Sequence, residues 1–262
     1  REYQAFVERT NLSTDSIADI YPLSPLQEGM LFHRMMSPES ATYIIQMDIG
    51  LGAEVDIQAL KQAWKEVVNR HAVLRTSFHS EELDRSLQVG KKAVELNWHE
   101  EDLSLLPVEE QQTSISEFLI ADRQQDFDLQ ADSLLRLTLL KESHQYRLIV
   151  SHHHIILDGW SLPIIFDDLK LAYKGKALGG ELAYGLFIAW LEKKDKEKQE
   201  AFWKDYLSGY ETASRIPFLE QTDQEGQAGD YTINLNQEQT QALSRVAAKA
   251  GVRLNTVLQA IW

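Results

Sequence analysis

The sequence predicts an α/β fold in which a mixed sheet is flanked by helices. Three observations support this fold class. Stretches with the composition and alternation of strands occur at residues 87–98, 134–140 and 146–152. An amphipathic helical pattern at 109–126 lies between two of them, and another helical pattern follows at 162–173. The chain has 262 residues, of which 44% are hydrophobic, so it can bury one large core or two modest ones.

The first sharp structural signal along the chain is a helix start at Ser24. Ser24 suits the N-cap, Pro25 suits the first helical position, and Gln27 completes a capping box before a run of apolar residues. Residues 1–20 are polar and weakly periodic, so we expect a linker from a preceding domain there. A strand-like stretch at 42–49 follows the first helix.

A second helix is predicted to begin after Asp56. Asp56 suits the N-cap, and apolar residues then recur at helical spacing. The pattern places Arg70 and His71 near the end of this helix. Residues 75–78 are predicted to be extended.

Turn and cap signals organise the rest of the chain. A polar turn at 142–145 joins the two predicted strands on either side of it. Ser161 precedes the helix predicted at 162–173, and Gly175 follows it. Further helices are expected at 197–208, 237–250 and 255–262, and the segments at 174–183 and 219–230 are the expected boundaries.

Composition and charge exclude several classes of protein. The formal net charge of −14 opposes binding to a nucleic-acid backbone or an anionic membrane surface. The chain has no cysteine, which excludes disulfides, thiolate metal sites and a cysteine nucleophile, and the cytoplasm is the expected location. It also lacks an apolar run of the roughly 18 residues that span a membrane, and residues 1–19 do not have the basic-then-apolar order of a signal peptide. Because it begins at Arg1 and ends within a helical pattern at Trp262, we expect a piece of a longer protein.

Reactive side chains are most concentrated at residues 151–161, between a predicted strand and a predicted helix. Loops at strand ends are frequent catalytic positions. If the strand alternation continues through the histidines, His152 and His154 share one face and His153 takes the other. A neutral histidine can accept a proton from an attacking amine or hydroxyl. Asp158, if ionised and desolvated, needs a cationic partner or several hydrogen bonds.

Three alternatives compete for this cluster. A metal site is one, but the spacing is not that of a zinc-hydrolase helix, and no thiolate or clustered carboxylate lies nearby in the sequence. Core histidines satisfied by backbone carbonyls are another, and this is the preferred interpretation of His152. Serine hydrolysis is weakly supported, because the sequence has no Gly-x-Ser-x-Gly elbow.

The histidine cluster resembles a known motif. His153-His154-Ile155-Ile156-Leu157-Asp158-Gly159 matches the His-His-x-x-x-Asp-Gly motif of the condensation domains of nonribosomal peptide synthetases, and Trp160-Ser161 extends the match. Other segments follow in the family's order: Tyr21 to His33, Arg70-His71 through Leu74-Arg75-Thr76 and Phe78, Phe127-Asp128-Leu129, Leu134-Leu135-Arg136 and Trp190-Leu191-Glu192. The resemblance covers nearly the whole chain from residue 20.

The resemblance implies a chloramphenicol-acetyltransferase-like fold, in which two similar α/β lobes meet at a cleft as a pseudo-dimer. The histidine motif would lie at the centre of a tunnel. Residues 1–20 would be the linker from a preceding carrier domain, 21–178 the amino-terminal lobe, and 179–262 the connection and the beginning of the carboxyl-terminal lobe. Where the family often has Tyr-x-Asp-Phe, this chain has Tyr184-Gly185-Leu186-Phe187, so the connection between the lobes stays open.

Roles for individual residues follow from the same resemblance. His154, the second histidine of the motif, would be the catalytic one, and His153 its structural neighbour. Asp158 is expected to pair with Arg75, which would hold the loop. Gly159 would permit close approach of substrate and donate its N–H to a developing oxyanion. Trp160 and Ser161 would support the site.

The implied activity is amide-bond formation between a donor aminoacyl or peptidyl thioester and an acceptor aminoacyl thioester. Both substrates would ride on phosphopantetheine arms of carrier domains, with no metal, nucleotide or other cofactor bound by the domain itself. The expected partners are the upstream and downstream carrier domains, a neighbouring adenylation domain and the rest of the carboxyl-terminal lobe. The form of the first motif, with Leu157 inside the histidine motif, resembles the subtype whose donor ends in a D-residue.

Other functions remain open at this point. An epimerization domain shares the histidine motif, although its first motif usually differs from the one here. A coenzyme-A-dependent acyltransferase of the same superfamily shares a His-x-x-x-Asp signature but is not expected to carry the motif at residues 21–33. A third possibility is an inactive fragment that docks carrier domains.

Overall fold

A computed structural model describes residues 12–36, 42–80, 85–130, 133–180, 182–212 and 232–261, together with residues 6 and 10. The chain divides into two compact units, Arg1–Ala201 and Phe202–Trp262. The candidate site lies in the first unit, whose mixed α/β composition confirms the predicted fold class.

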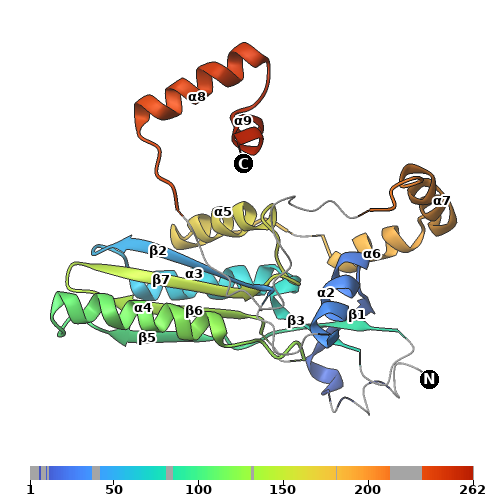
Figure 1. Cartoon of the computed structure of the whole chain (residues 1–262). Helices are drawn as coiled ribbons and strands as arrows, with labels where there is room; N and C mark the ends of the chain where they lie inside the picture. Colours follow the sequence, from blue (N-terminus) through green and yellow to red (C-terminus); the bar gives the residue numbers. More distant parts are fainter. Residues whose placement is uncertain are drawn as a thin grey trace. The chain divides into compact units, whose positions relative to one another are not determined.

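Two β-sheets form the frame of the first unit (Figure 1). One has the order β1-β4-β3 and is antiparallel, and the other has the order β2-β7-β6-β5, with β5 and β6 parallel and the remaining pairs antiparallel. The strands are β1 (Ile17–Pro22), β2 (Ile44–Gly52), β3 (Thr76–His79), β4 (Leu87–Lys91), β5 (Trp98–Asp102), β6 (Leu135–Lys141) and β7 (Gln145–His153). Ile44 pairs with His153, so the start of β2 lies beside the end of β7.

The helices begin largely where the cap residues predict. The α-helices are α2 (Pro25–Met36), α3 (Ile57–Arg70), α4 (Val108–Gln124), α5 (Ser161–Tyr173), α6 (Tyr184–Glu192), α7 (Lys196–Tyr206), α8 (Gln237–Ala250) and α9 (Leu254–Ile261), and short 3₁₀ helices cover Thr14–Ser16 and Ala72–Arg75. The Asp56 side chain accepts a hydrogen bond from Ala59 N at 2.9 Å and caps α3. Ser24 and Gln27 form the predicted reciprocal capping box at α2.

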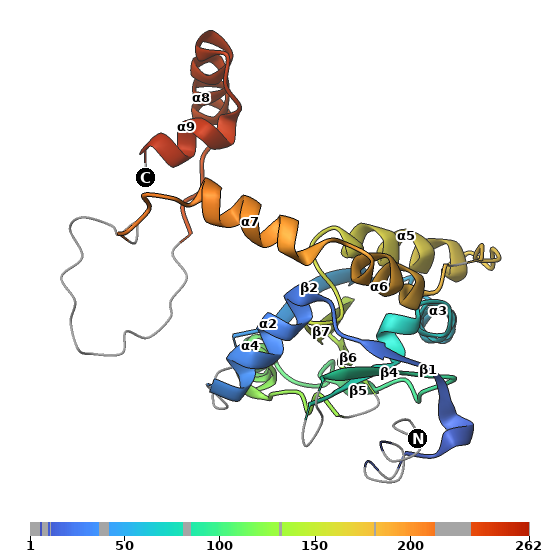
Figure 2. The ribbon, with the colours of Figure 1, turned by 90° about the vertical axis from the view of Figure 1, so that its right-hand side faces the viewer.

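The four-stranded sheet is covered on both faces, by α3 and α5 on one and by α4 on the other (Figure 2). Alternate side chains of β7 pack into two hydrophobic clusters, one on each face of the sheet. Leu148 and Val150 belong to the cluster that includes residues of α3 and α5, whereas Ile149 packs with Ile115 of α4. Since both faces of β7 are buried, the residues at its end are held by packing on two sides.

Two local predictions were wrong, and one helix was not predicted. The strand predicted over 87–98 is two strands in different sheets, β4 and β5, because period-2 alternation does not tell which sheet a strand joins. Residues 17–20, inside the predicted linker, belong to β1, and a register shift between Ile17 and Asp19 breaks their alternation. Helix α6 was not predicted, since Ala183 at its N-cap makes no side-chain capping bond.

The second unit, taken by itself, has well-marked helix ends. Asn236 and Gln239 form a complete capping box at the start of α8, and Gly251 ends it with φ of 66°. The predicted helices at 237–250 and 255–262 are thereby confirmed to within two residues.

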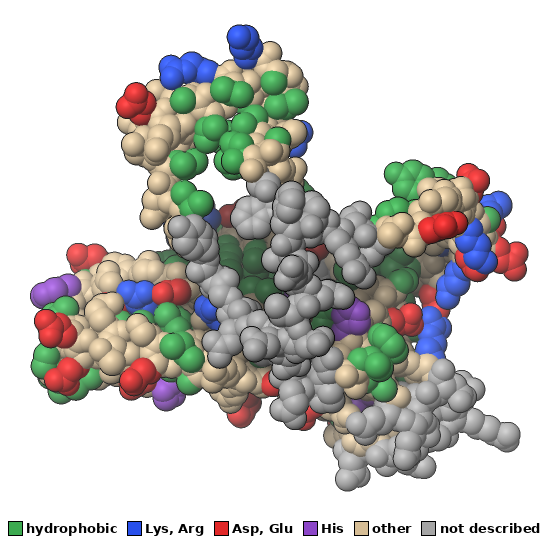
Figure 3. Space-filling view, in the orientation of Figure 1, with side chains coloured by type: hydrophobic (Ala, Val, Ile, Leu, Met, Phe, Trp, Pro, Cys, Tyr) green, Lys and Arg blue, Asp and Glu red, His purple; other side chains and the backbone are tan. Residues whose placement is uncertain are grey.

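Acidic side chains are spread over the face that carries α4 and β5 (Figure 3), in keeping with the negative net charge. Within the described ranges, no helix is both long and apolar enough to span a bilayer.

Candidate active site

The histidine motif forms a tight turn between β7 and α5. β7 ends at His153, so the strand alternation does not continue to His154, which lies in the turn and is half-buried. The N–H of His154 donates to the carbonyl oxygen of Tyr43 at 2.7 Å, just before β2 begins. The N–H of Ile156 donates to the carbonyl oxygen of His153 at 3.2 Å. The backbone of the turn is therefore tied to the edge of the sheet.

The imidazole of His154 is fixed by one short hydrogen bond. Its Nδ1 lies 2.5 Å from the carbonyl oxygen of Leu157. A carbonyl oxygen only accepts, so Nδ1 must carry the proton, and in the neutral ring Nε2 then has a lone pair. Nε2 has no hydrogen-bond partner among the residues that the structure describes. The geometry thus presents a proton acceptor at Nε2.

The two preceding histidines are buried and neutral. Burial, followed by the charge of its neighbours His154 and His153, lowers the pKa of His152 to about 4. Burial also lowers the pKa of His153 to about 4, with Asp126 opposing the shift. The Nδ1 of His153 accepts from the N–H of Ile155 at 3.1 Å, which supports the turn from inside. His153 therefore has the place of a structural neighbour in this turn, while the Nδ1 of His152 is buried without a hydrogen bond among the described residues.

Asp158 organises the start of α5. Its Oδ1 accepts from the N–H groups of Trp160 at 3.1 Å and Ser161 at 2.8 Å, and from Ser161 Oγ at 2.7 Å. The side-chain bond from Ser161, followed by the backbone bonds, lowers the pKa of Asp158. Asp158 is exposed, and Trp160 is 88% exposed.

The predicted ion pair between Asp158 and Arg75 is absent from the described part of the chain, so this expectation was wrong. The carboxylate of Asp158 is satisfied locally, at the start of α5. Arg75 ends the 3₁₀ helix before β3 and is 8% exposed, and its Nη1 donates to the carbonyl oxygen of Lys91 in β4 at 3.5 Å. Arg75 thus contributes to the three-stranded sheet.

Gly159 lies in open space beside the turn. A Cβ built on this residue meets no atom within 4 Å, and its φ is not positive. Its N–H has no acceptor within the described residues. Room for an approaching group and an available donor therefore occur together at Gly159.

A cavity of about 630 Å³ opens beside the turn. Its walls come from the start of α2, the turn, the start of α5, α6 and the 3₁₀ helix at 72–75. The lining residues are Ser24, Pro25, Leu26, Gln27, Met30, Val73, His154, Ile155, Ile156, Leu157, Asp158, Ser161, Tyr184, Phe187 and Leu191. The cavity is mostly apolar, with His154 and Asp158 as its titratable groups besides the phenol of Tyr184.

Sequence reasoning missed the contribution of Gln27 and Tyr184 to this cavity. Gln27 was recognised only as a capping residue, and Tyr184 only as part of a departure from the family's pattern. Burial raises the pKa of Tyr184, so its hydroxyl stays protonated at neutral pH. No pattern in the sequence indicates that these two side chains face the histidine turn.

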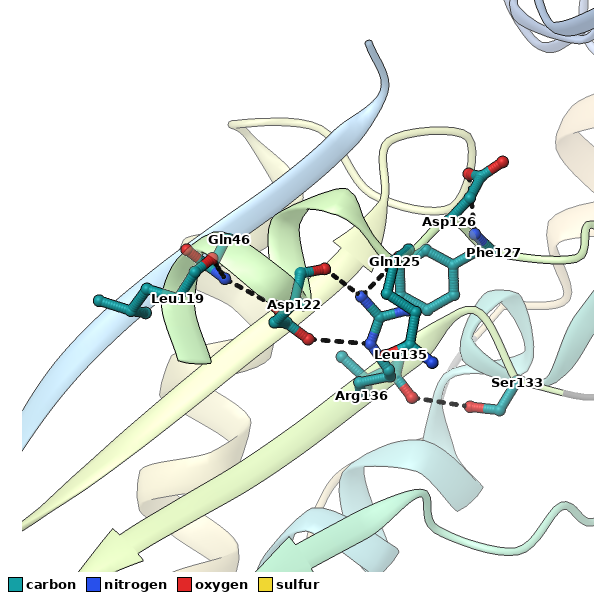
Figure 4. Close-up of polar contacts among 10 residues, drawn as sticks. Gln46, Leu119, Asp122, Gln125, Asp126, Phe127, Ser133, Leu135 and Arg136 are labelled. Carbon is teal, nitrogen blue, oxygen red and sulfur yellow. Dashed lines mark hydrogen bonds and ion pairs between the residues drawn. The ribbon is translucent and has the colours of Figure 1, made fainter. Parts of the chain in front are cut away.

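A buried ionic network braces β7 just before the histidines (Figure 4). Arg136 of β6 donates from Nε to Oδ1 of Asp122 at 3.0 Å and from Nη2 to the carbonyl oxygens of Asp122 and Gln125, both at 2.8 Å. Ser151 of β7 and Gln46 of β2 donate to Oδ2 of the same carboxylate, at 2.5 and 2.6 Å. The network ties α4, β2, β6 and β7 together.

A cluster of three or more histidine, aspartate or glutamate side chains that fits a metal ion does not occur in the described ranges.

Comparison with known proteins agrees with the geometry. The family model described as Condensation domain matches residues 17–262. The chain is 38% identical to bacitracin synthase 1 of Bacillus licheniformis, over 95% of this chain and 5% of that protein. It is 36% identical to tyrocidine synthase 2 of Brevibacillus parabrevis, over 95% of this chain and 7% of that protein. The chain thus spans a small part of the length of these relatives.

The fold has solved counterparts. The chain superposes on the first condensation domain of the calcium-dependent antibiotic synthetase, solved with a substrate analogue, with a TM-score of 0.70. The match has 17% sequence identity and covers 90% of this chain and 57% of that one. The predicted chloramphenicol-acetyltransferase-like architecture is confirmed by this likeness. Because the family model matches nearly the whole chain, the chain belongs to the condensation domain family of nonribosomal peptide synthetases.

Proposed function

We propose that the domain to which this chain contributes joins a donor aminoacyl or peptidyl thioester to an acceptor aminoacyl thioester. One observation carries the proposal: His154 lines a cavity of about 630 Å³ with Nδ1 held by the Leu157 carbonyl oxygen and Nε2 left as an acceptor. Family membership supports it, because peptide-bond formation is the activity of the family.

The reaction needs an acceptor for one proton. The ordinary pKa of an α-amine is about 8, so much of it is protonated at neutral pH, and only the neutral amine attacks. Its nitrogen forms a C–N bond to the thioester carbonyl carbon, and the C–S bond breaks. Nε2 of His154 accepts the proton that the nitrogen loses, and the sulfur leaves as the thiol after taking up a proton. If His154 instead chiefly orients the attacking amine, the same lone pair on Nε2 accepts the hydrogen bond from the amine.

The remaining motif residues have supporting roles in this proposal. His153 stays neutral and holds the turn through Ile155, and Asp158 fixes the start of α5 together with Ser161. The N–H of Gly159 is a donor for the oxyanion that forms when the amine attacks. Trp160, which is exposed, lies next to this donor. Arg75 supports the adjacent sheet.

We further propose that the amino-terminal lobe begins with β1 at residue 17 and runs to residue 178, that a linker precedes it, and that 179–262 form the connection and the beginning of the carboxyl-terminal lobe. Two carrier domains would deliver the substrates on phosphopantetheine arms, and an adenylation domain and the remaining lobe are the other partners. Tethering both substrates would supply much of the acceleration, because the thioester is already activated. The protein would act in the cytoplasm.

A reconstituted condensation tests the proposal. Matched donor and acceptor carrier domains, each loaded with a thioester, are mixed with this chain or with a version extended through the second lobe, and the acceptor is followed by intact mass. Several donor stereoisomers are included, which tests the D-donor subtype. We expect product with the extended protein and none with its folded His154→Ala variant.

Each other outcome has its own meaning. Product that forms equally with His154→Ala would overturn the assigned role of His154. Inversion of the donor α-carbon without condensation would indicate an epimerization domain, and transfer from acyl coenzyme A in the absence of carriers would indicate the acyltransferase alternative.

A further inference from the structure

Gln27 makes a buried connection between α2 and the histidine turn. Gln27 is 5% exposed, and its Nε2 donates to the carbonyl oxygen of Ile155 at 3.2 Å. Its Oε1 accepts from Ser24 N at 2.9 Å and from Nε2 of Gln88 at 3.0 Å. Gln88, on β4, is fully buried and also donates to the carbonyl oxygen of Pro22.

The two ends of the Gln27 amide have only one consistent assignment. The backbone N–H of Ser24 can only donate, so the atom beside it must be the oxygen. The carbonyl oxygen of Ile155 can only accept, so the atom beside that must be the nitrogen. A side chain that keeps the shape of glutamine but lacks the N–H donor cannot replace it.

The connection is made at the middle of the catalytic turn. Ile155 lies between His154 and Leu157, whose carbonyl oxygen holds the imidazole Nδ1. The carbonyl oxygen of Tyr43 accepts from the N–H of His154 at the beginning of the turn, and His153, which ends β7, accepts from the N–H groups of Ile155 and Ile156. Among the described residues, Gln27 is the side chain of a helix that bonds to the backbone at the middle of the turn, and it also lines the cavity.

We infer that Gln27 is a positioning residue for His154: its amide holds the Ile155 carbonyl, and the turn thus held keeps the Leu157 carbonyl on Nδ1 and the lone pair on Nε2. The effect on turnover rests on the proposed role of His154. The effect on the imidazole is independent of any activity. Without the tie, Leu157 moves relative to the ring and both neutral tautomers are populated.

Two variants separate this role from the capping role of the same residue. Gln27→Glu keeps the capping box, because a glutamate at this position still accepts from Ser24 N, but its carboxylate cannot donate to Ile155. Gln27→Met removes both bonds. The matched control is Gln111→Met, since Gln111 of α4 is 2% exposed and likewise donates to a carbonyl oxygen, that of Leu106 at 2.8 Å, away from the cavity.

The tautomer of His154 is measured by ¹H–¹⁵N correlation of the histidine rings at mildly alkaline pH, where imidazole is neutral. A His154→Asn sample assigns the signal. We expect a protonated Nδ1 and a bare Nε2 in the unaltered chain and in Gln111→Met, and mixed tautomers in both Gln27 variants. In the extended protein, kcat of the Gln27 variants should fall about tenfold or more with KM changed less than about twofold.

An unchanged tautomer in folded Gln27→Glu, together with a kcat equal to that of Gln111→Met, would overturn the inference. If Gln27→Met does not fold, the comparison of Gln27→Glu with the unaltered chain decides. If no protein forms product, the proposed function fails, and the ring spectra alone still decide whether Gln27 positions His154.

Discussion

Replacing Arg136 with methionine should destabilise the unit Arg1–Ala201 by about 3–5 kcal/mol. The magnitude follows from what the guanidinium holds: the carboxylate and carbonyl oxygen of Asp122 and the carbonyl oxygen of Gln125. The side chains of Arg136 and Asp122 are 12% and 5% exposed, so water cannot replace the lost donors. Among the described residues, the carboxylate of Asp122 would keep only Gln46 and Ser151 as hydrogen-bond partners for its buried charge. A unit of this size should lose about 6–20 °C in Tm.

The assay is urea unfolding followed by circular dichroism, with a matched surface variant. Arg85→Met removes an arginine whose ion pair with Glu192 is nearly half-exposed, and it should cost less than about 1 kcal/mol. Adding Asp122→Leu to Arg136→Met should recover part of the loss, because no charge is then left buried. If Arg136→Met costs no more than Arg85→Met, the buried ion pair does not brace β7 and this reasoning is refuted.

Three further predictions concern residues 152–161, in and around the motif. Burial holds the folded-state pKa of His152 and of His153 near 4, below the ordinary 6.5, so the unfolded chain binds more protons between these pH values and the free energy of unfolding falls as pH falls. Each residue accounts for about 3 kcal/mol between pH 7 and pH 4. Urea titrations of His152→Leu should therefore show a smaller change of stability with pH, and a slope equal to that of the unaltered chain would contradict the burial argument. Ser161→Ala should raise the pKa of Asp158 by removing its largest stabilising bond, which carboxyl NMR titration measures, and an unchanged pKa would contradict the geometry. Gly159→Ala should leave the Tm within about 2 °C, since its Cβ meets nothing, yet should slow condensation; a loss of stability would show that the site is more crowded.

Local signals predicted much of the fold. The caps at Ser24 and Asp56 reflect hydrogen bonds between residues three positions apart, so the sequence carries them directly. Strands at 135–141 and 145–153 were predicted to within one residue for the same reason. Sheet membership is a long-range property, and the pattern at 87–98 could not show that β4 and β5 join different sheets.

The sequence pointed to the histidine turn but not to the contacts that hold it. The resemblance named His154 as the catalytic residue, a role that stays a proposal. The atom that fixes its ring is the carbonyl oxygen of Leu157, and a backbone atom leaves no trace in residue identity. Asp158 was expected to need a distant cation. Asp158 is exposed, and its carboxylate accepts hydrogen bonds from Ser161, three residues further along the chain. The desolvation cost that led us to expect an ion pair with Arg75 is therefore small.

The rate of a single condensation turnover tests the central claim most directly. Donor and acceptor carriers are preloaded, and the extended protein is compared with its His154→Asn variant, whose amide nitrogen can still donate to Leu157 while no atom takes the place of Nε2. With equal circular dichroism spectra and Tm, we predict a fall of about a hundredfold or more in the bond-forming rate. A rate within about threefold of the unaltered protein would contradict the assignment of Nε2 as the acting atom.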